Sequence, residues 1–191
     1  PIPEDVPLLL DNLFKYMNDE FIDPLFVNLA ISHSQFETIH AYRDGNGRLG
    51  RALIPIQLAK LTDDTPILFL SEVIELYKPS YHKFLNESRK GNMLGFIKFF
   101  LHCIIEQCNN YISKINMIKN IYFRDMDKIK TLNSNAVYRI MPAMMHQIVF
   151  TKKEIEEESG VSRNTVSTLI DQLIELGILV PDSTYAKLGY R

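Results

Sequence analysis

One stretch of the chain contains most of the side chains that could do chemistry together. In order, it holds a histidine, a carboxylate, two glycines around an asparagine and two arginines: His40, Asp44, Gly45, Asn46, Gly47, Arg48 and Arg51. Histidine is the usual general base near neutral pH, and a carboxylate suits Mg²⁺ that is shared with phosphates. Glycines let backbone amides turn toward one anion, and arginines grip phosphate oxygens in pairs of hydrogen bonds. The stretch therefore predicts a site that holds a polyphosphate beside a base.

Helices are expected on both sides of this loop. Apolar residues before it recur at helical spacing up to Ile39, and residues 49–61 form a mostly apolar run that we expect to be a buried helix, interrupted or kinked at Pro55. Gly45 and Gly47 can take positive φ at little cost. Arg48 and Arg51 are three residues apart and so share a helix face. Because the free N–H groups of a helix start bind anions, the second helix would add to the phosphate site.

Two other phosphate-binding patterns do not fit. Residues 45–50 satisfy G-x-G-x-x-G, but a dinucleotide-binding fold needs a strand before the glycines, and a helix is predicted there. A P-loop needs Gly-Lys-Ser/Thr, which does not follow. His33 lies seven residues before His40, too far along a straight helix for both to bind one ion, so we interpret His33 as structural.

The stretch resembles the signature of the Fic family, His-x-Phe-x-(Asp/Glu)-Gly-Asn-Gly-Arg-x-x-Arg, with Tyr42 in place of the phenylalanine. The resemblance continues in Pro3 with Val6-Pro7, in residues 34–39 and in residues 70–72, and it covers roughly residues 1–118. It implies an α-helical bundle around a helix–loop–helix. We expect Tyr42 to pack as the phenylalanine would, with a partner for its hydroxyl.

The same resemblance implies an enzyme, a protein adenylyltransferase that moves AMP from ATP to a Ser, Thr or Tyr hydroxyl of a target protein or of itself. It implies His40 as the base, Asp44 as the Mg²⁺ ligand and a phosphate- or nucleotide-binding role for five loop residues: Gly45, Asn46, Gly47, Arg48 and Arg51. In the family a second stretch lines the nucleoside, and residues 77–82 correspond to it here, with Tyr81 as the one match. We therefore expect Tyr81 to bind nucleotide. The family's target-docking β-hairpin and inhibitory helix would precede residue 1, so the chain is expected to be a fragment of a bacterial protein that retains the nucleotide site.

A second module is predicted at residues 135–191, joined to the first by a linker or helix at 119–134. Thr151 and Glu154 form a capping-box pattern, Gly160 suits a turn, and a helix after Ser162 precedes a strand at residues 178–180 with a possible partner at 188–191. This order resembles a winged helix-turn-helix. The chain is therefore expected to be all-α with a minor β-hairpin.

Charge bears on the partners of this module. Residues 151–191 contain five Lys or Arg against seven Asp or Glu, and the whole chain carries a net charge of −2. Since DNA affinity needs cationic surface, DNA binding is possible but not favoured, and we favour protein docking or self-association into a homo-oligomer. Cys103 and Cys108 are expected to be reduced, buried thiols. With no leader peptide and no membrane span in the sequence, we expect a cytoplasmic protein.

Two rival functions stay open at this point. One is a nucleotide-sensing transcriptional regulator or adaptor that acts through the winged-helix module. The other is the kinase activity of Doc-like relatives, which Gly47 and Arg51 oppose, because the Doc pattern places a lysine near Gly47 and lacks the second arginine.

Overall fold

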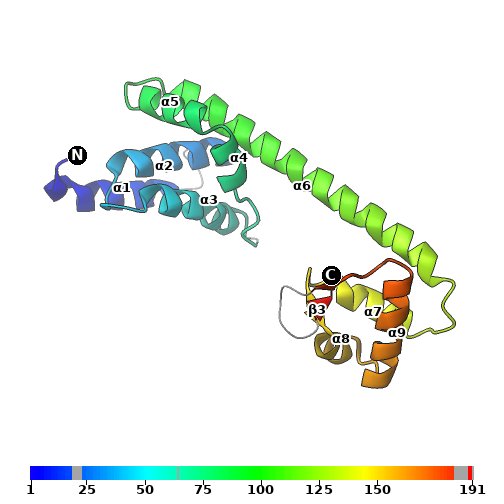
Figure 1. Cartoon of the computed structure of the whole chain (residues 1–191). Helices are drawn as coiled ribbons and strands as arrows, with labels where there is room; N and C mark the ends of the chain where they lie inside the picture. The colour runs from blue at the N-terminus through cyan, green and yellow to red at the C-terminus, as the bar shows by residue number, and fades with distance from the viewer. Residues whose placement is uncertain (19–22, 64, 183–188, 191) are drawn as a thin grey trace. The chain divides into compact units, whose positions relative to one another are not determined.

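The computed structural model describes residues 1–18, 23–63, 65–182 and 189–190 (Figure 1). A short 3₁₀ turn is followed by nine α-helices and three two-residue strands within these residues. The elements are η1 (Pro3–Asp5), α1 (Val6–Met17), α2 (Leu25–Ile39), α3 (Asn46–Thr62), α4 (Ser71–Leu76), α5 (Lys78–Ser88), α6 (Met93–Ile129), α7 (Val137–Met144), β1 (Phe150–Thr151), α8 (Lys152–Ser159), α9 (Arg163–Glu175), β2 (Pro181–Asp182) and β3 (Gly189–Tyr190). The predicted all-α class is confirmed.

The chain divides into two compact units, residues 1–113 and residues 114–191, and the division falls within α6. In the first unit, α1, α2 and α3 lie side by side (Figure 1). A buried cluster joins α2 and α3 to α4, α5 and the first part of α6, with Leu29, Ile54, Ile74, Leu85 and Phe100 among its members. A smaller cluster packs α1 against α2. These contacts fix the two helices that flank the predicted loop.

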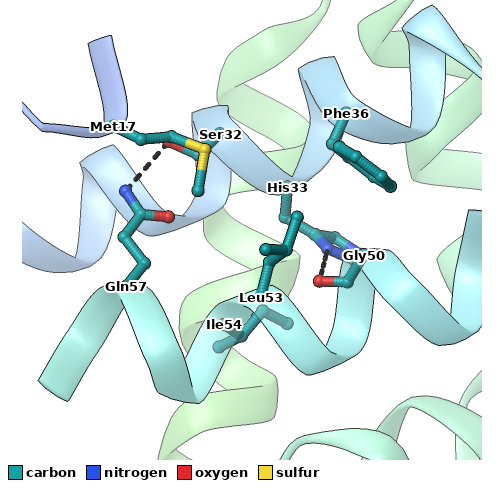
Figure 2. A pocket seen from close by; sticks show the side chains of 8 residues that line it. All are labelled: Met17, Ser32, His33, Phe36, Gly50, Leu53, Ile54 and Gln57. Atoms are coloured by element: carbon teal, nitrogen blue, oxygen red, sulfur yellow. Dashed lines mark hydrogen bonds between the residues drawn. The ribbon is translucent and has the colours of Figure 1, made fainter. Parts of the chain in front are cut away.

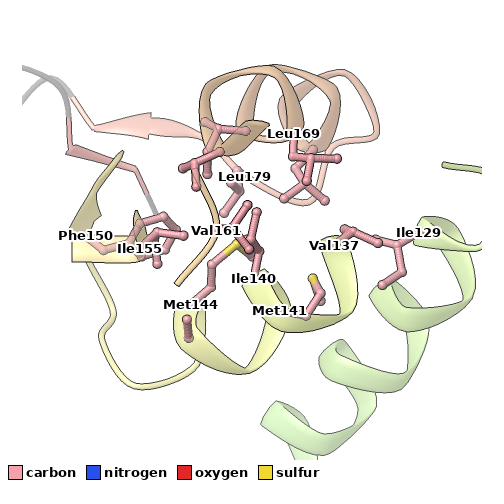
Figure 3. Close-up of a cluster of buried hydrophobic side chains, with 14 residues drawn as sticks. Ile129, Val137, Ile140, Met141, Met144, Phe150, Ile155, Val161, Leu169 and Leu179 are labelled. Carbon is pink, nitrogen blue, oxygen red and sulfur yellow. The ribbon is translucent and has the colours of Figure 1, made fainter. Parts of the chain in front are cut away.

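The second unit has its own hydrophobic core. The end of α6 contributes Ile129, and α7, α8 and α9 contribute most of the remaining side chains, Ile140, Ile155 and Leu169 among them (Figure 3). The three strands form one antiparallel sheet in the order β1-β3-β2. The Thr151 capping box is confirmed, with Glu154 N–H donating to the hydroxyl and the glutamate side chain accepting from Thr151 N–H. The winged-helix interpretation of these elements stays a prediction.

The prediction of a strand at residues 178–180 is wrong, because the strand begins only at Pro181. The backbone N–H groups of Ile178 and Leu179 both donate to the carbonyl of Leu173, after Gly177 takes a φ of 63°. These residues therefore complete the C-terminus of α9, and β2 begins at Pro181. Of its predicted partner, residues 188 and 191 lie outside the described residues, and β3 comprises Gly189–Tyr190.

Other expectations also need correction. The helix predicted at residues 49–61 begins at Asn46, and it is not buried all round, since Leu49 and Ile56 are exposed on its outer face. Cys103 is buried but Cys108 is exposed, because five residues along a helix place two side chains on different faces. Within the described residues, no helix is both long and apolar enough to cross a bilayer.

Candidate active site

The loop between α2 and α3 is set by two residues in left-handed backbone conformation. His40 ends α2 with φ 51° and ψ 53°, and its N–H donates to the Phe36 carbonyl. Gly45 precedes α3 with φ 85°. A left-handed histidine is uncommon and costs free energy, so the surrounding structure must impose this conformation. The reversal turns the His40 side chain out of the helix register, and the imidazole is exposed.

Asn46 fastens the loop from within. Its side-chain oxygen accepts from Tyr42 N–H at 3.0 Å, and its amide nitrogen donates to the Tyr42 carbonyl at 2.5 Å. The residue is only 2% exposed. Its side chain therefore holds the loop closed and does not reach outward as a phosphate ligand would. The predicted nucleotide-binding role of Asn46 thus rests on its backbone N–H.

The start of α3 presents free backbone donors. Leu49 N–H donates to the Gly45 carbonyl, which closes the first helical turn and leaves the N–H groups of Asn46, Gly47 and Arg48 without acceptors inside the helix. These amides, together with the partial positive charge of the helix start, favour an anion. Of the two glycines that can take positive φ at little cost, Gly45 does so, whereas Gly47 lies in the first turn of α3.

Two arginines and one carboxylate surround these amides. Arg48 and Asp44 form an ion pair at 3.2 Å, with their side chains 77% and 92% exposed. An exposed pair of this kind contributes little to stability, so both groups can turn to a ligand at small cost. Arg51 lies one turn further along α3 and is half-buried.

A cleft of about 510 Å³ opens beside His40. Apolar residues of the N-terminal segment, Pro3 and Val6 among them, form one part of its lining, and His40, Tyr42 and Arg43 contribute to the rest. Tyr42 is 52% exposed, so the expectation that it packs as the phenylalanine would is met only in part. The imidazole therefore lines a space large enough for a side chain of another molecule.

Behind the loop, His33 joins three helices. Its Nδ1 lies 3.2 Å from the Gly50 carbonyl and its Nε2 lies 3.0 Å from the Tyr81 hydroxyl. Because a carbonyl only accepts, Nδ1 carries the proton and Nε2 accepts from Tyr81. Burial lowers the pKa of His33 to about 4, so the ring is neutral near pH 7. The structural interpretation of His33 is thereby supported, since it ties α2 to α3 and α5.

Tyr81 is not placed with the other candidate residues. Its side chain is 4% exposed within the core of the first unit, and burial raises the pKa of its phenol well above the usual range. A tyrosine whose hydroxyl is bonded to His33 and whose ring is enclosed cannot contact a nucleotide directly. The structure therefore corrects the predicted role of Tyr81, which packs behind the site.

Figure 2 shows the interior space between α2 and α3 that His33 lines together with Ser32, Leu53 and Gln57. Its volume is about 10 Å³, which is about enough for one water molecule and for no larger ligand. Gln57 donates to Asn28 at 2.6 Å and to Ser32 at 3.1 Å across the same interface. These buried hydrogen bonds fix the two helices that flank the loop.

Two residues near the loop were missed from the sequence. Glu37 is 5% exposed although it carries a carboxyl group, and it lies on α2 one turn after His33. Burial raises the pKa of Glu37, while the charge of Arg51 opposes this shift. Arg89, at the end of α5, donates to the Glu37 carbonyl at 2.9 Å and so satisfies the C-terminal turn of α2 next to His40. Helical spacing from His33 could have identified Glu37, but nothing in the sequence points to Arg89.

Whether the loop can bind Mg²⁺ depends on the ligand atoms that its side chains offer. Within the described ranges, no three residues of the types His, Cys, Asp and Glu are grouped as metal ligands. Asp44 alone offers accessible carboxylate oxygens beside the helix start. Mg²⁺ in nucleotide sites commonly takes one or two carboxylates together with substrate phosphates and water, so one exposed aspartate fits such an ion.

Fold and site together define a helical protein in which an exposed histidine precedes a helix start flanked by arginines. Residues 1–58 match the sequence model of the Fic/DOC family. The chain is 28% identical over 114 residues to "Protein adenylyltransferase Fic" of Drosophila erecta, which covers 59% of this chain and 22% of that protein. The protein of the same name from Nematostella vectensis is 25% identical over 116 residues, 59% of this chain and 26% of that protein. The chain thus spans about a fifth to a quarter of the length of these relatives.

A solved structure supports the fold. A Fic family protein from Desulfovibrio desulfuricans G20 superposes with a TM-score of 0.57 at 19% sequence identity, over the whole of this chain and 56% of that one. The likeness concerns the fold alone. The chain therefore shares a helical fold with this protein.

Proposed function

We propose that this chain contains the nucleotide site of a protein adenylyltransferase, which transfers AMP from ATP to the hydroxyl of a Ser, Thr or Tyr side chain. The observation that carries the proposal is the loop itself, in which free helix-start amides, Arg48 and Arg51 surround one side and the exposed His40 lies at the other. The adenylyltransferase name of the curated relatives supports the same reaction.

In this reaction His40 accepts the proton of the attacking hydroxyl. The hydroxyl oxygen forms a bond to the α-phosphorus, the bond from that phosphorus to the bridging oxygen breaks, and pyrophosphate leaves. The amides of Gly47 and Arg48 and the two guanidiniums neutralise the phosphate oxygens, the usual means of catalysis in phosphoryl-type transfer. Asp44 would hold Mg²⁺, which supplies further charge neutralisation at the phosphates.

The acceptor would enter through the cleft beside His40. That cleft is lined by apolar residues and by Tyr42 and Arg43, and none of the anion-loop residues from Asp44 onward contributes to it. The imidazole thus borders both the acceptor space and the loop. This division lets hydroxyl and triphosphate approach His40 without competing for the same surface.

We further propose that the second unit is a winged helix-turn-helix that docks protein. The order of α8, the Gly160 turn, α9 and a small sheet supports this interpretation. The excess of acidic residues over residues 151–191 disfavours a DNA duplex as the partner.

The test is transfer of label from ATP that carries radioactive phosphorus at either the α or the γ position. We expect the chain, or a protein in a lysate, to take up the α label in the presence of Mg²⁺. His40→Ala should abolish this label while ATP binding remains. As a matched control, His82→Ala removes an exposed histidine outside the loop and should leave the labelling unchanged.

Two results would count against the proposal. Uptake of the γ label without the α label would indicate kinase chemistry, in which the terminal phosphate moves. Equal α labelling by the wild type and His40→Ala would show that another group is the base or that the transfer occurs elsewhere on the protein.

A further inference from the structure

Glu37 has a buried oxygen without a hydrogen-bond partner. Among the residues that the structure describes, only Glu37 and Gln107 have a fully buried side-chain oxygen in this state. Burying a carboxyl oxygen without a donor costs free energy, more so when the group is charged. A buried oxygen without a partner beside a candidate ligand site therefore suggests that Glu37 has a role in ligand binding.

The space around this oxygen is created by two glycines of α3. A Cβ at Gly50 would come within 2.5 Å of Glu37 Oε1, so the carboxyl group lies directly against that glycine. A Cβ at Gly47 would come within 3.1 Å of Arg51 Nη1 and 3.8 Å of Glu37 Oε1. The guanidinium and the carboxyl group therefore both border the space that a side chain at Gly47 would fill.

The charges that face Glu37 come from three elements. Among these charges, Arg51 on α3 lowers the pKa of Glu37 most, followed by His40 at the end of α2, Arg89 at the end of α5, and His82 on α5. All four groups carry or can carry positive charge. Of these, Arg51 has its guanidinium beside Gly47, as the Glu37 oxygen is, and lies about one helical turn from the free amides at the start of α3.

We propose that Glu37 is a positioning residue for Arg51: its carboxyl group attracts the guanidinium toward Gly47, so that N–H groups on the other side of the guanidinium point to the phosphates of a bound nucleotide. A planar guanidinium has five N–H donors in a fixed arrangement, so one carboxyl group can orient it and leave donors for a second anion. This inference rests on the proposed function, because it assigns Glu37 a role only if the loop binds a triphosphate.

The positioning role and simple charge repulsion predict opposite signs. An acid near an anion site that acts only through its charge repels the anion, so its removal should tighten binding. A positioning acid orders the arginine, so its removal should weaken binding, and only while the arginine is present. Glu37→Gln removes the charge and keeps the volume, which avoids a cavity between α2 and α3.

The experiment is a double-mutant cycle on ATP binding, measured by isothermal titration calorimetry with Mg²⁺ on the whole chain. We expect Glu37→Gln to weaken ATP binding about fivefold or more in the wild-type background, and less than about twofold in an Arg51→Ala background. Glu75→Gln is the matched control, since Glu75 is an exposed acid that also feels the charge of Arg51. It should leave the affinity within about twofold of the wild type or tighten it. Urea unfolding of each variant separates a loss of folding from a loss of binding.

The outcomes separate this inference from the proposed function. If the wild type binds ATP and Arg51→Ala weakens binding, but Glu37→Gln tightens it, leaves it unchanged or weakens it equally in both backgrounds, Glu37 does not position Arg51. If Arg51→Ala does not weaken ATP binding, Arg51 lies outside the phosphate site and the inference fails with it. A wild type that binds no ATP would overturn the proposed function and this inference together.

Discussion

The stability of the first unit should depend on pH through His33. The ring is fully enclosed, with one nitrogen bonded to Gly50 in α3 and the other to Tyr81 in α5. Burial lowers the pKa of His33 from its ordinary value of 6.5 to about 4, assisted by the charge of Arg51 and opposed by the hydrogen bond to Gly50. The unfolded chain therefore takes up a proton near pH 6.5, whereas the folded chain resists protonation down to about pH 4.

The sign follows from this difference in proton uptake. Above pH 6.5 the ring is neutral in both states and His33 causes no pH dependence. As the pH falls from 6.5 toward 4 the unfolded state binds the additional proton, so stability falls. Each pKa unit corresponds to about 1.4 kcal/mol, so between pH 7 and pH 4.5 the first unit should lose about 2 kcal/mol through this residue.

Urea unfolding followed by circular dichroism at pH 7 and pH 4.5 measures this loss, with His33→Gln as the control. Glutamine can donate and accept hydrogen bonds but does not titrate in this range. The transition that His33→Gln shifts at pH 7 reports on the first unit. The free-energy difference between wild type and variant should shrink by about 2 kcal/mol at pH 4.5. A difference that stays constant between the two pH values would refute the account of His33 as a buried neutral clamp.

Three further predictions concern single contacts. Asn46→Ala removes both hydrogen bonds to the Tyr42 backbone and should weaken ATP binding by about tenfold in calorimetry. Asn46→Asp should have an intermediate affinity, because it keeps one acceptor. An unchanged affinity would show that the loop is ordered without these two hydrogen bonds. Tyr81→Phe leaves His33 Nε2 unpaired and should destabilise the first unit by about 1–2 kcal/mol in urea unfolding, while the ATP affinity stays within about twofold of the wild type. A large loss of ATP affinity without a loss of stability would show that Tyr81 contacts the nucleotide. Thr151→Ala removes the acceptor for Glu154 N–H and should cost about 1 kcal/mol in the second unit alone, visible as faster hydrogen exchange in α8 but not in α2.

Local sequence signals predicted the parts of this protein whose structure is decided locally. The Thr151–Glu154 pair marked the start of α8, because capping depends on residues only three positions apart. The candidate loop was found for the same reason, since its glycines, asparagine and arginines are contiguous. Its preceding helix, which excluded a dinucleotide-binding fold, is confirmed as α2.

Features decided by tertiary packing were not predictable in this way. Tyr81 is sealed in the core by contact with His33, 48 positions earlier in the sequence, and Arg89 reaches the end of α2 from α5. The motif indicates that Asn46 is a ligand, yet its side chain is hydrogen-bonded to the backbone of its own loop. The left-handed conformation of His40, which has a side chain that disfavours it, depends on the helices around it.

The most direct test of the central claim is a crystal structure of the chain with Mg²⁺ and an ATP analogue that resists transfer. We expect the phosphates to accept hydrogen bonds from the backbone N–H groups of Gly47 and Arg48, with both arginine side chains on their oxygens and the α-phosphate on the side of His40. A nucleotide bound away from the start of α3, or an imidazole turned from the α-phosphate with the loop amides covered by side chains, would contradict the proposed adenylyl transfer.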